Sequence, residues 1–151
     1  MTYGIFVLST KDGDFDNACI VNTAVQVGAE PIRVAVSVQN HNYTKELIEK
    51  TGKFNVSVLT ESVPFEVIKR FGMQTGREVN KFDGFKDFLR SRNGLLYLTE
   101  NVNAYFSAEV KDKVDLGSHT LFIAEVVEGK KLNDAPSCTY AHYHKAIKKP
   151  L

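Results

Sequence analysis

Cysteine is scarce in this sequence, and long apolar runs are absent. The two cysteines, Cys19 and Cys138, have neither CxxC spacing nor a paired-ligand pattern, which argues against a structural zinc or an iron–sulfur site. No apolar stretch approaches the roughly 20 residues that a membrane helix needs. The first residues also lack the cationic start and the long apolar core of a secretory signal. We therefore expect a cytoplasmic protein with reduced thiols and no membrane segment.

The chain also lacks an excess of charge of either sign. Lys and Arg total 19 and Asp and Glu total 18, for a formal net charge of +1. Since no basic stripe is present, nucleic acid is not an expected partner. With 151 residues, 43% of them hydrophobic, the composition predicts one globular domain, residues 1–151, with a core that needs no disulfide staples.

Common catalytic motifs are missing as well. The sequence contains no Walker-type loop, no GxGxxG, no GxSxG and no carboxylate pair at an obvious catalytic spacing. We therefore assign no catalytic residue. Two histidines, His142 and His144, alternate with Tyr143 and would share one face of a strand with Tyr140. They have no evident third partner, so a metal site is not expected.

Strand-like segments dominate the chain. Residues 3–10 form an apolar run that ends near the turn signal Asp12-Gly13, and residues 17–27 are predicted as the returning strand. Further strands are expected at residues 32–38, 54–59, 95–99, 104–110 and 120–127. Because helices and strands do not alternate regularly, we expect a mainly β protein with a closed or nearly closed antiparallel barrel.

Short helices are expected between some of these strands. One spans residues 45–50, with Asn42 or Thr44 as its N-cap and Gly52 after it. A second is capped by Ser62, has Pro64 in its first turn and ends at residues 71–72, and a third is possible at residues 86–90. The segment 72–84 between them has no clean period and is predicted to be a long loop, which is often functional.

The stretch "SVQNHNYT", residues 37–44, carries more polar groups than a strand-to-helix turn needs. Turn amides, short polar side chains and a helix start together form a neutral receptor for an anion such as phosphate. The alternative is that Asn40 and Asn42 merely adopt turn conformations and that Thr44 caps the helix.

The stretch "TGREVNKF" in the long loop is a second candidate for phosphate binding. Gly76 allows a close backbone approach, Arg77 supplies a planar fork and Lys81 a point charge. Phe82 would cover an aromatic ligand. Taken alone, however, this stretch is more typical of a mobile surface loop with ordinary solvated charges.

Two further positions are candidate contacts. Asn22 and Thr23 are adjacent, so in a strand their side chains would point to opposite faces of the sheet. The one that faces the interior would need a hydrogen-bond partner there, either a ligand or a neighbouring carbonyl. His119 lies where a turn enters a strand, where an imidazole is either exposed or able to hydrogen-bond a cofactor or move a proton.

Six segments taken in order resemble the flavin reductase-like family, which has the FMN-binding split-barrel fold. They are "YGIFVLST", "NACIVNTAVQV", "EPIRVAVSVQNHNYTKELIEKTGKFNVSVL", "FGMQTGREVNKFDG", "GSHTLFIAEVVEG" and "CTYAHYHK". The order and spacing of the six are more specific than any one of them. The chain is most similar to the branch of small NAD(P)H:FMN oxidoreductases that can be fused to rubredoxin, and without CxxC pairs no rubredoxin module is expected.

The resemblance implies a six-stranded antiparallel split β-barrel of Greek-key type with short flanking helices, acting as a homodimer with FMN near the interface. It implies that Asn22 and Thr23 border the isoalloxazine ring and that Gly76, Arg77 and Lys81 close over the phosphate or the adjacent ribityl chain. The cofactor-binding set that follows from it is Asn22, Thr23, Ser37, Val38, Asn40, Asn42, Thr44, Gly76, Arg77, Lys81 and Phe82. His119 matches the histidine of the family's Gly-Asp-His motif, placed near the nicotinamide, but Ser118 stands in the position of the Asp.

The function implied by the resemblance is that of an FMN-binding oxidoreductase. NADH or NADPH would deliver hydride to FMN, which would pass electrons to free flavin, a ferric complex or a redox protein. Such hydride transfer needs positioning rather than a protein nucleophile. The alternatives are a non-enzymatic FMN-binding electron carrier and, with His142 and His144 in mind, a split barrel that binds haem or a nucleotide.

Overall fold

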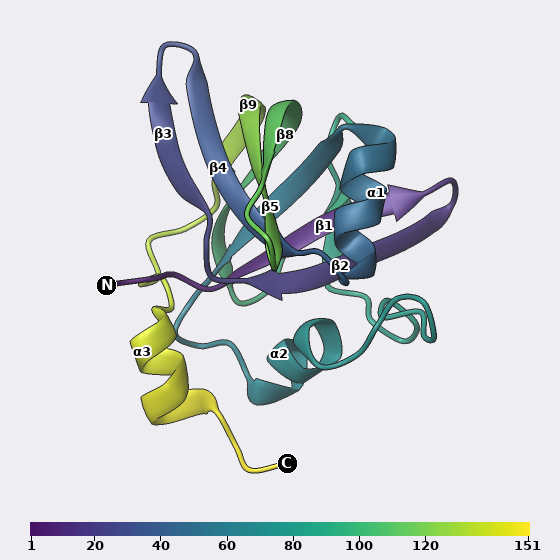
Figure 1. Cartoon of the computed structure of the whole chain (residues 1–151). Helices are drawn as coiled ribbons and strands as arrows, with labels where there is room; N and C mark the ends of the chain where they lie inside the picture. Colours follow the sequence, from purple (N-terminus) through teal and green to yellow (C-terminus); the bar gives the residue numbers. More distant parts are fainter.

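The computed structural model describes all residues, 1–151, and shows a mainly β protein built on one large antiparallel sheet (Figure 1). Its seven strands run in the order β2-β1-β5-β8-β9-β4-β3. Their bounds are β1 Phe6–Asp12, β2 Phe15–Val21, β3 Val25–Ala29, β4 Ile32–Gln39, β5 Lys53–Leu59, β8 Val102–Asp115 and β9 His119–Lys131. A separate hairpin pairs β6 (Phe88–Arg90) with β7 (Leu96–Leu98).

The sheet corrects the expected barrel in two respects. It has seven strands instead of six, and it is not closed, because β2 and β3 remain as its two edges. Strong curvature replaces closure: the long strands β8 and β9 shift register at Ser107/Ala108 and again at Val110/Asp112, and such bulges bend and twist a strand pair. The sheet thus curls into an open, barrel-like shell.

The predicted strand over residues 17–27 is two strands. β2 ends at Val21 and β3 begins at Val25, on the opposite edge of the sheet. The Thr23 hydroxyl donates to the Ser37 carbonyl at 2.9 Å and accepts from the Ser37 amide at 3.2 Å. The Thr23 side chain thus forms the hydrogen bonds that a neighbouring strand would otherwise make with Ser37 of β4. At Asn22 and Thr23 the chain crosses from the β2 edge of the sheet to the β3 edge.

Helix α1 (Tyr43–Thr51) confirms the predicted helix and its caps. The Asn42 side chain accepts from the Thr44 amide, and Gly52 adopts a left-handed conformation with φ of 71°, which glycine reaches without strain. The helix contacts β1, β2 and β4. Its buried Ile48 joins a core cluster of strand residues from the concave side of the sheet.

Helix α2 (Phe65–Gly72) ends where expected but starts after Pro64 rather than after a Ser62 cap. The Ser62 hydroxyl instead lies 2.7 Å from that of Thr60 and donates to the Asn101 side chain. The possible helix at residues 86–90 is the short strand β6. None of the helices is long and apolar enough to cross a membrane.

The C-terminal segment is helical, not a strand. Helix α3 (Tyr140–His142) continues into a π-helical turn, η1 (Tyr143–Ile147), and the Thr139 side chain caps it by accepting from the His142 amide. Tyr140 and Tyr143 are therefore neighbours on one helical face. The predicted strand was therefore wrong, although Tyr140 and His144 are still neighbours, with ring centres 4.4 Å apart.

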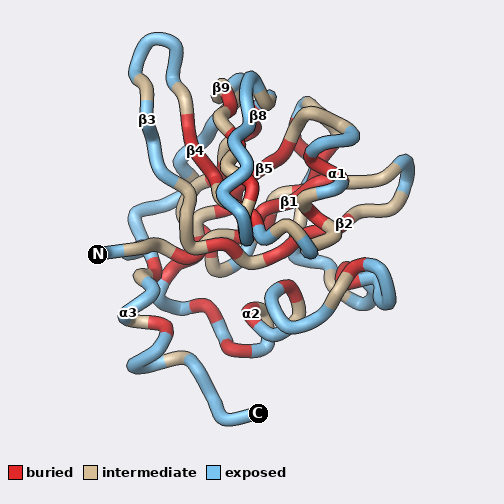
Figure 2. The backbone as a smooth tube through the Cα atoms, viewed as in Figure 1, coloured by how far each residue is buried: buried red, intermediate tan, exposed pale blue.

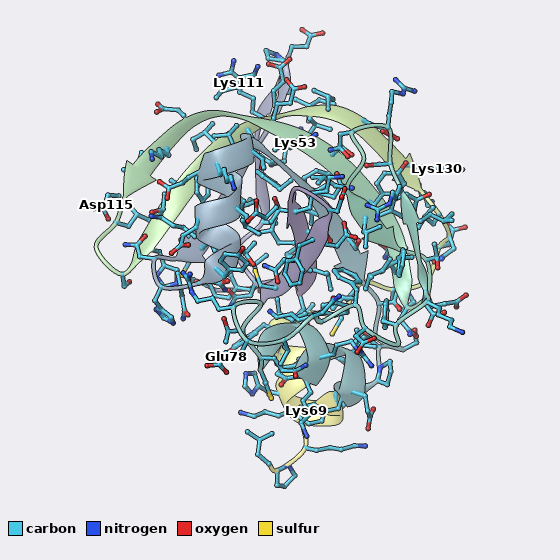
Figure 3. The ribbon with its side chains drawn as sticks, turned by 90° about the vertical axis from the view of Figure 1, so that its right-hand side faces the viewer. Lys53, Lys69, Glu78, Lys111, Asp115 and Lys130 are labelled. Carbon is cyan, nitrogen blue, oxygen red and sulfur yellow. The ribbon has the colours of Figure 1, made fainter.

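Burial is concentrated on the two faces of the central strands (Figure 2). Val7 and Leu8 are consecutive in β1 and point to opposite faces of the sheet. Val7 belongs to the core cluster that includes residues of α2 and the C-terminal segment, and Leu8 belongs to the cluster inside the curled sheet. Charged side chains such as Lys111, Asp115 and Lys130 lie around the periphery (Figure 3). The site described next lies where α2, the C-terminal helix and the ends of β2 and β4 meet.

Candidate functional site

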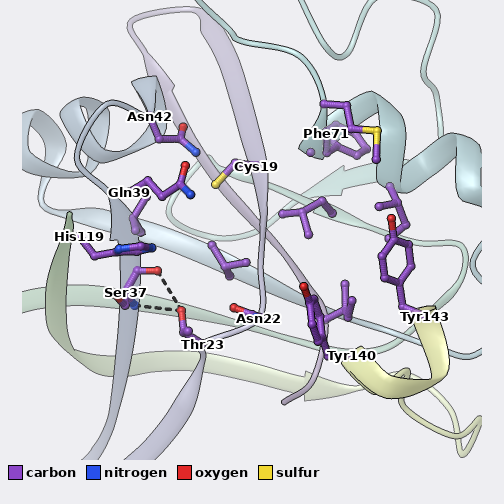
Figure 4. Close-up of a pocket in the computed structure, with 17 residues that line it drawn as sticks. Cys19, Asn22, Thr23, Ser37, Gln39, Asn42, Phe71, His119, Tyr140 and Tyr143 are labelled. Atoms are coloured by element: carbon purple, nitrogen blue, oxygen red, sulfur yellow. Dashed lines mark hydrogen bonds between the residues drawn. The ribbon is translucent and has the colours of Figure 1, made fainter. Parts of the chain in front are cut away.

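A cavity of about 330 Å³ opens between the sheet and the two helices below it (Figure 4). No lining side chain carries a formal charge at neutral pH apart from His119, which does so only when protonated. Such a cavity favours a neutral, flat ligand over a free ion. The lining residues are Ile5, Cys19, Ile20, Val21, Asn22, Thr23, Ser37, Val38, Gln39, Asn42, Ile68, Phe71, Gly72, Met73, His119, Tyr140 and Tyr143.

One end of the cavity is polar. It is formed where β2 gives way to Asn22 and Thr23 and where β4 ends at Ser37 and Gln39. The Thr23 hydroxyl is engaged with Ser37, as described above, but the side chains of Asn22, Ser37 and Gln39 make no hydrogen bond within the protein. Free amide and hydroxyl groups therefore face the cavity as donors and acceptors for a ligand.

Asn42 extends this polar end to the start of α1. Its side chain caps the helix by accepting from the Thr44 amide at 3.0 Å, so the helix N-terminus lies beside the cavity. Thr44 itself is fully buried and accepts a hydrogen bond from Asn17 at 3.0 Å. Burial raises the pKa of the neighbouring Cys19 thiol, which keeps it protonated and weakly reactive.

His119 lies at the mouth of the same end. It pairs with Gln39 in the β4–β9 register, and its Nδ1 lies 2.8 Å from the Ser118 hydroxyl. The serine hydroxyl thus contacts the imidazole directly. The imidazole ring lines the cavity. Val38 of β4 forms a buried part of the cavity wall.

The opposite end is apolar and aromatic. Ile68, Phe71 and Met73 come from α2 and the residue after it, and Tyr140 and Tyr143 come from the C-terminal helix. Tyr143 is only 6% exposed, and burial raises its pKa. Neither tyrosine hydroxyl has a hydrogen-bond partner in the protein.

Asn40 lies beside the cavity but does not line it. Its amide donates to the Gly117 carbonyl at 2.8 Å, and its carbonyl oxygen accepts from the Thr120 hydroxyl at 2.6 Å. Both contacts fasten the β8–β9 hairpin tip to the end of β4. Asn40 therefore does not contact the cavity directly. It fixes the hairpin tip next to His119, the first residue of β9.

Gly76 and Arg77 pack against the first turn of α1. A Cβ at Gly76 would collide with the Asn17 side chain and press on Tyr43, so glycine is required for this approach. The Arg77 guanidinium pairs with Glu46 and lies 4.9 Å from the centre of the Tyr43 ring. The hydrogen bond from Arg77 lowers the pKa of Glu46. Arg77 thus lies at the helix start, outside the cavity wall.

Lys81 and Phe82 do not reach the cavity, which corrects their expected placement. Lys81 is 3% exposed, and its Nζ donates to the carbonyls of Ala18 at 2.7 Å and Phe71 at 2.9 Å. Burial lowers its pKa. Phe82 packs in the core 5.2 Å from Phe71, measured between ring centres. Both residues anchor the loop rather than contact a phosphate or a ring.

The sequence analysis missed the aromatic end of the cavity. Phe71 was treated only as the end of a helix, Met73 as part of the loop 72–84, and Tyr140 and Tyr143 as members of a strand. The spacing of the two tyrosines, three residues apart, is the signal that would have placed them on one face of a helix. The amide of Gln39 and the thiol of Cys19 were also overlooked.

The open, curled sheet thus carries a cavity lined by uncharged polar and apolar side chains. Comparison with known proteins identifies the class further. The flavin reductase like domain model matches residues 1–149. The chain is 38% identical over 144 residues to the high molecular weight rubredoxin of Moorella thermoacetica, covering 95% of this chain but only 62% of that protein.

A second relative is the ferric-chelate reductase (NAD(P)H) of Archaeoglobus fulgidus. The identity is 34%, and the match covers 95% of this chain and 85% of that protein. The chain therefore belongs to the family of flavin reductase-like oxidoreductases. This confirms the resemblance found in the six sequence segments.

Solved structures share the fold. The flavin reductase PheA2 has a TM-score of 0.77 at 24% identity, over 92% of this chain and 85% of that one. An FMN-binding protein from Thermus thermophilus, solved with bound 1-cyclohex-2-enone, has a TM-score of 0.78 at 23% identity, over 87% and 71% of the two chains. Both support the mainly β architecture with flanking helices.

Proposed function

We propose that the protein is an FMN-binding, NAD(P)H-dependent oxidoreductase. The observation that carries this proposal is the cavity itself: unpaired amides and hydroxyls at one end, an apolar aromatic wall at the other, and no permanent charge between them. A flavin ring is flat and uncharged over most of its surface and carries heteroatoms along one edge. The donor set of this cavity fits such a ring.

The cavity residues divide according to the parts of FMN. Asn22, with Thr23 and Val38 beside it, would border the ring, and Ser37 would contact the ribityl chain. The phosphate would lie beside Asn42 at the N-terminus of α1, where the helix dipole favours an anion. Arg77 lies at this same helix turn and could exchange Glu46 for the phosphate, while Thr44 and Gly76 support the turn from behind.

Bound FMN would supply a two-electron acceptor that the amino acids of the chain do not provide. The part of the protein is to hold the ring, exclude water with Ile68 and Phe71, and admit the nicotinamide at the open mouth beside His119. The Ser118 hydroxyl orients the imidazole through Nδ1 and leaves Nε2 for the nicotinamide amide. We expect either NADH or NADPH as the electron donor.

We further propose a homodimer with the flavin near its interface. The strand β3 is a sheet edge, and Val25, Val27 and Ile32 on the β3–β4 hairpin are 57%, 55% and 49% exposed. They adjoin an apolar hollow lined by Phe6 and Phe106, among others. Exposed apolar patches of this kind mark interaction surfaces, and Asn22 and Thr23 at the cavity lead directly into β3.

A visible spectrum of the purified protein, followed by anaerobic addition of NADH and then NADPH, tests the oxidoreductase. We expect a yellow protein that retains FMN and is bleached rapidly by at least one nucleotide. A yellow protein that neither nucleotide reduces would instead be a non-enzymatic electron carrier. A protein that neither retains FMN nor quenches its fluorescence would refute both, and a haem spectrum would point to the third alternative.

Electrons would leave the flavin for free flavin, a ferric complex or a redox protein. The relative described as a ferric-chelate reductase supports the ferric complex, and the relative described as a rubredoxin supports a redox protein. Reoxidation of the bleached protein by each acceptor in turn ranks them.

A further inference from the structure

Three exposed lysines without an ion-pair partner belong to α2 and the C-terminal segment. They are Lys69, Lys145 and Lys148. The carboxylate of Glu66 on α2 pairs with Lys149 instead, at 3.5 Å. Residues 135–151 contain no Asp or Glu at all. This end of the molecule therefore carries an excess of positive charge, although the whole chain is almost neutral.

Two exposed apolar side chains lie among these lysines. Met73 is 39% exposed and Tyr140 is 40% exposed, and both line the aromatic end of the cavity. Met73 follows Lys69 by one helical turn, since its amide donates to the Lys69 carbonyl at 3.1 Å. The His144 ring lies 4.4 Å from the Tyr140 ring, measured between ring centres, and Lys145 is the next residue. Positive charge therefore borders an apolar rim of the cavity.

We call this surface, formed by the three lysines with Met73 and Tyr140, the basic face. Its composition suits transient docking of a protein of opposite charge, because an apolar centre makes the contact while charges around it steer the approach. A partner bound there would reach the cavity from its aromatic end, whereas the nicotinamide is expected at the other end, beside His119 (Figure 4). A second copy of this chain is disfavoured, because a two-fold contact would bring the positive face against itself.

We propose that the basic face docks a small, acidic, one-electron redox protein, which takes electrons from the flavin at the Met73 and Tyr140 rim. This docking rests on the proposed function for its source of electrons, and it selects the redox protein among the acceptors considered there. Each NAD(P)H loses a hydride and becomes NAD(P)⁺. The two electrons of the hydride pass to two partner molecules, one each, and its proton is released to solvent. Such redox encounters are small, burying less than about 1,200 Å².

The test compares the Lys69→Glu/Lys145→Glu double variant with the wild type, both loaded with FMN. Neither lysine forms an ion pair or lines the cavity, so reduction by NADH or NADPH should be unchanged and reports an intact flavin site. Lys111→Glu/Lys130→Glu is the matched control. These two lysines are exposed on β8 and β9, away from Lys69 (Figure 3), and their reversal lowers the net charge equally.

Reoxidation of the reduced protein is followed by stopped-flow absorbance with three acceptors. They are an acidic rubredoxin, cytochrome c, which is basic, and riboflavin, which is uncharged. Each is measured at about 0.01 M and about 0.1 M ionic strength, between which the Debye length falls from about 30 Å to about 10 Å. Attraction between opposite charges predicts a slower reaction of the wild type with rubredoxin at the higher ionic strength.

We expect the second-order rate with rubredoxin to fall about tenfold in Lys69→Glu/Lys145→Glu at low ionic strength, the size of a modest steering effect. The rate with riboflavin should stay the same, and the rate with cytochrome c should not fall. An equal fall in Lys111→Glu/Lys130→Glu, or an unchanged rubredoxin rate in Lys69→Glu/Lys145→Glu, overturns the docking site.

An anionic membrane is the competing partner for a positive surface. Co-sedimentation with vesicles of phosphatidylcholine and phosphatidylserine tests it with the same variants. Vesicle binding that Lys69→Glu/Lys145→Glu abolishes, combined with an unchanged rubredoxin rate, would assign the basic face to a membrane instead. Absence of vesicle binding, combined with the slower rubredoxin rate, supports the redox protein.

The proposed function can fail separately. If the wild-type protein is not bleached by NADH or NADPH, the oxidoreductase is refuted. Titration calorimetry with oxidised rubredoxin at low ionic strength then still tests the basic face, since it needs neither nucleotide nor electron transfer. Weaker binding by Lys69→Glu/Lys145→Glu than by Lys111→Glu/Lys130→Glu supports the docking site, and equal binding by the two variants overturns it.

Discussion

Arg77 is held at the start of α1 by two neighbours. Its guanidinium lies over Tyr43 and pairs with Glu46, both in the first turn of α1. A phosphate at the helix N-terminus would carry nearly two negative charges and would compete with the single charge of Glu46. The pair is exposed, so the exchange requires little rearrangement.

Two substitutions at this pair are expected to change FMN affinity in opposite directions. Arg77→Ala should weaken FMN by about 1.5–3 kcal/mol, the value of a charge-assisted hydrogen bond, while Glu46→Gln should strengthen it by releasing the guanidinium. Fluorescence titration measures both. Riboflavin, which has no phosphate, should respond to neither variant, whereas Asn22→Ala should weaken both ligands. Equal losses of FMN and riboflavin in Arg77→Ala would place Arg77 away from the phosphate.

Tyr105 predicts how stability responds to alkaline pH. Burial, followed by a hydrogen bond to Glu128, raises its pKa from 10.0 to about 12. An unfolded chain releases this proton near pH 10 and the folded chain only near pH 12, so the stability that the phenol contributes is complete below pH 10 and is lost between these values. Tyr105→Phe should flatten the fall in unfolding free energy over this range.

Urea titrations at neutral pH and at several alkaline values check this expectation. The variant should be less stable at neutral pH because Glu128 loses its 2.8 Å hydrogen bond, but it should lose less stability on further alkalinisation. Parallel pH profiles for variant and wild type would contradict the raised pKa.

At the scale of elements, the loop between α2 and β6 is fixed by a buried lysine. β2 is a sheet edge, and edge carbonyls need a partner. Lys81 donates to the Ala18 carbonyl on that edge and to the Phe71 carbonyl in the last turn of α2, where a cation also complements the helix dipole. The loop is therefore tied to the sheet and the helix at once.

Lys81→Met should keep the side-chain volume but leave both carbonyls without their donor. We expect a loss of unfolding free energy of about 1–3 kcal/mol and faster amide hydrogen exchange at the end of α2. Lys69→Met is the control, because Lys69 lies exposed on α2, the helix whose last turn Lys81 contacts. Similar stability for the two variants would show that the buried bonds contribute nothing.

The elements that sequence reasoning predicted well are those whose signals are local. Asn42 and Gly52 mark the ends of α1 by capping chemistry, and Asp12-Gly13 marks the β1–β2 turn. The failures involve contacts distant in sequence. Nothing near Thr23 indicates that its hydroxyl binds the backbone of β4, and nothing near Lys81 indicates that carbonyls of β2 and α2 surround it.

The candidate site shows the same division. Its polar end lies on strand ends whose surplus of short polar side chains is visible in the sequence, and Asn22, Ser37 and Asn42 do line the cavity. Its aromatic end forms only because the C-terminal segment is helical. The alternating pattern of "TYAHYHK" predicts a strand instead. The binding roles of all these residues remain predictions.

At the scale of the whole molecule, β3 is one of the two unpaired edges of the sheet and the site of the proposed dimer interface. Replacing Val27 and Ile32 together with glutamate should convert the proposed dimer to a monomer, because desolvating two carboxylates in an interface is costly. It should also weaken FMN, since the cavity adjoins this edge. Sedimentation velocity and FMN titration measure the two effects.

Val114→Glu serves as the control for this experiment. Val114 is 46% exposed on the β8–β9 hairpin, away from β3. A wild-type protein that sediments as a monomer would refute the dimer, and dissociation by Val114→Glu to the same extent would place the interface elsewhere.

The cavity draws its walls from residues as far apart in the chain as Ile5 and Tyr143. Ile5 is therefore synthesised long before Tyr143. A growing chain that has emerged only as far as β9 lacks Tyr140 and Tyr143 at the aromatic end of the cavity. If this cavity holds FMN as proposed, the cofactor would bind only after residues 140–143 have left the ribosome. A chain truncated before Thr139 should keep its sheet yet leave the purified protein colourless.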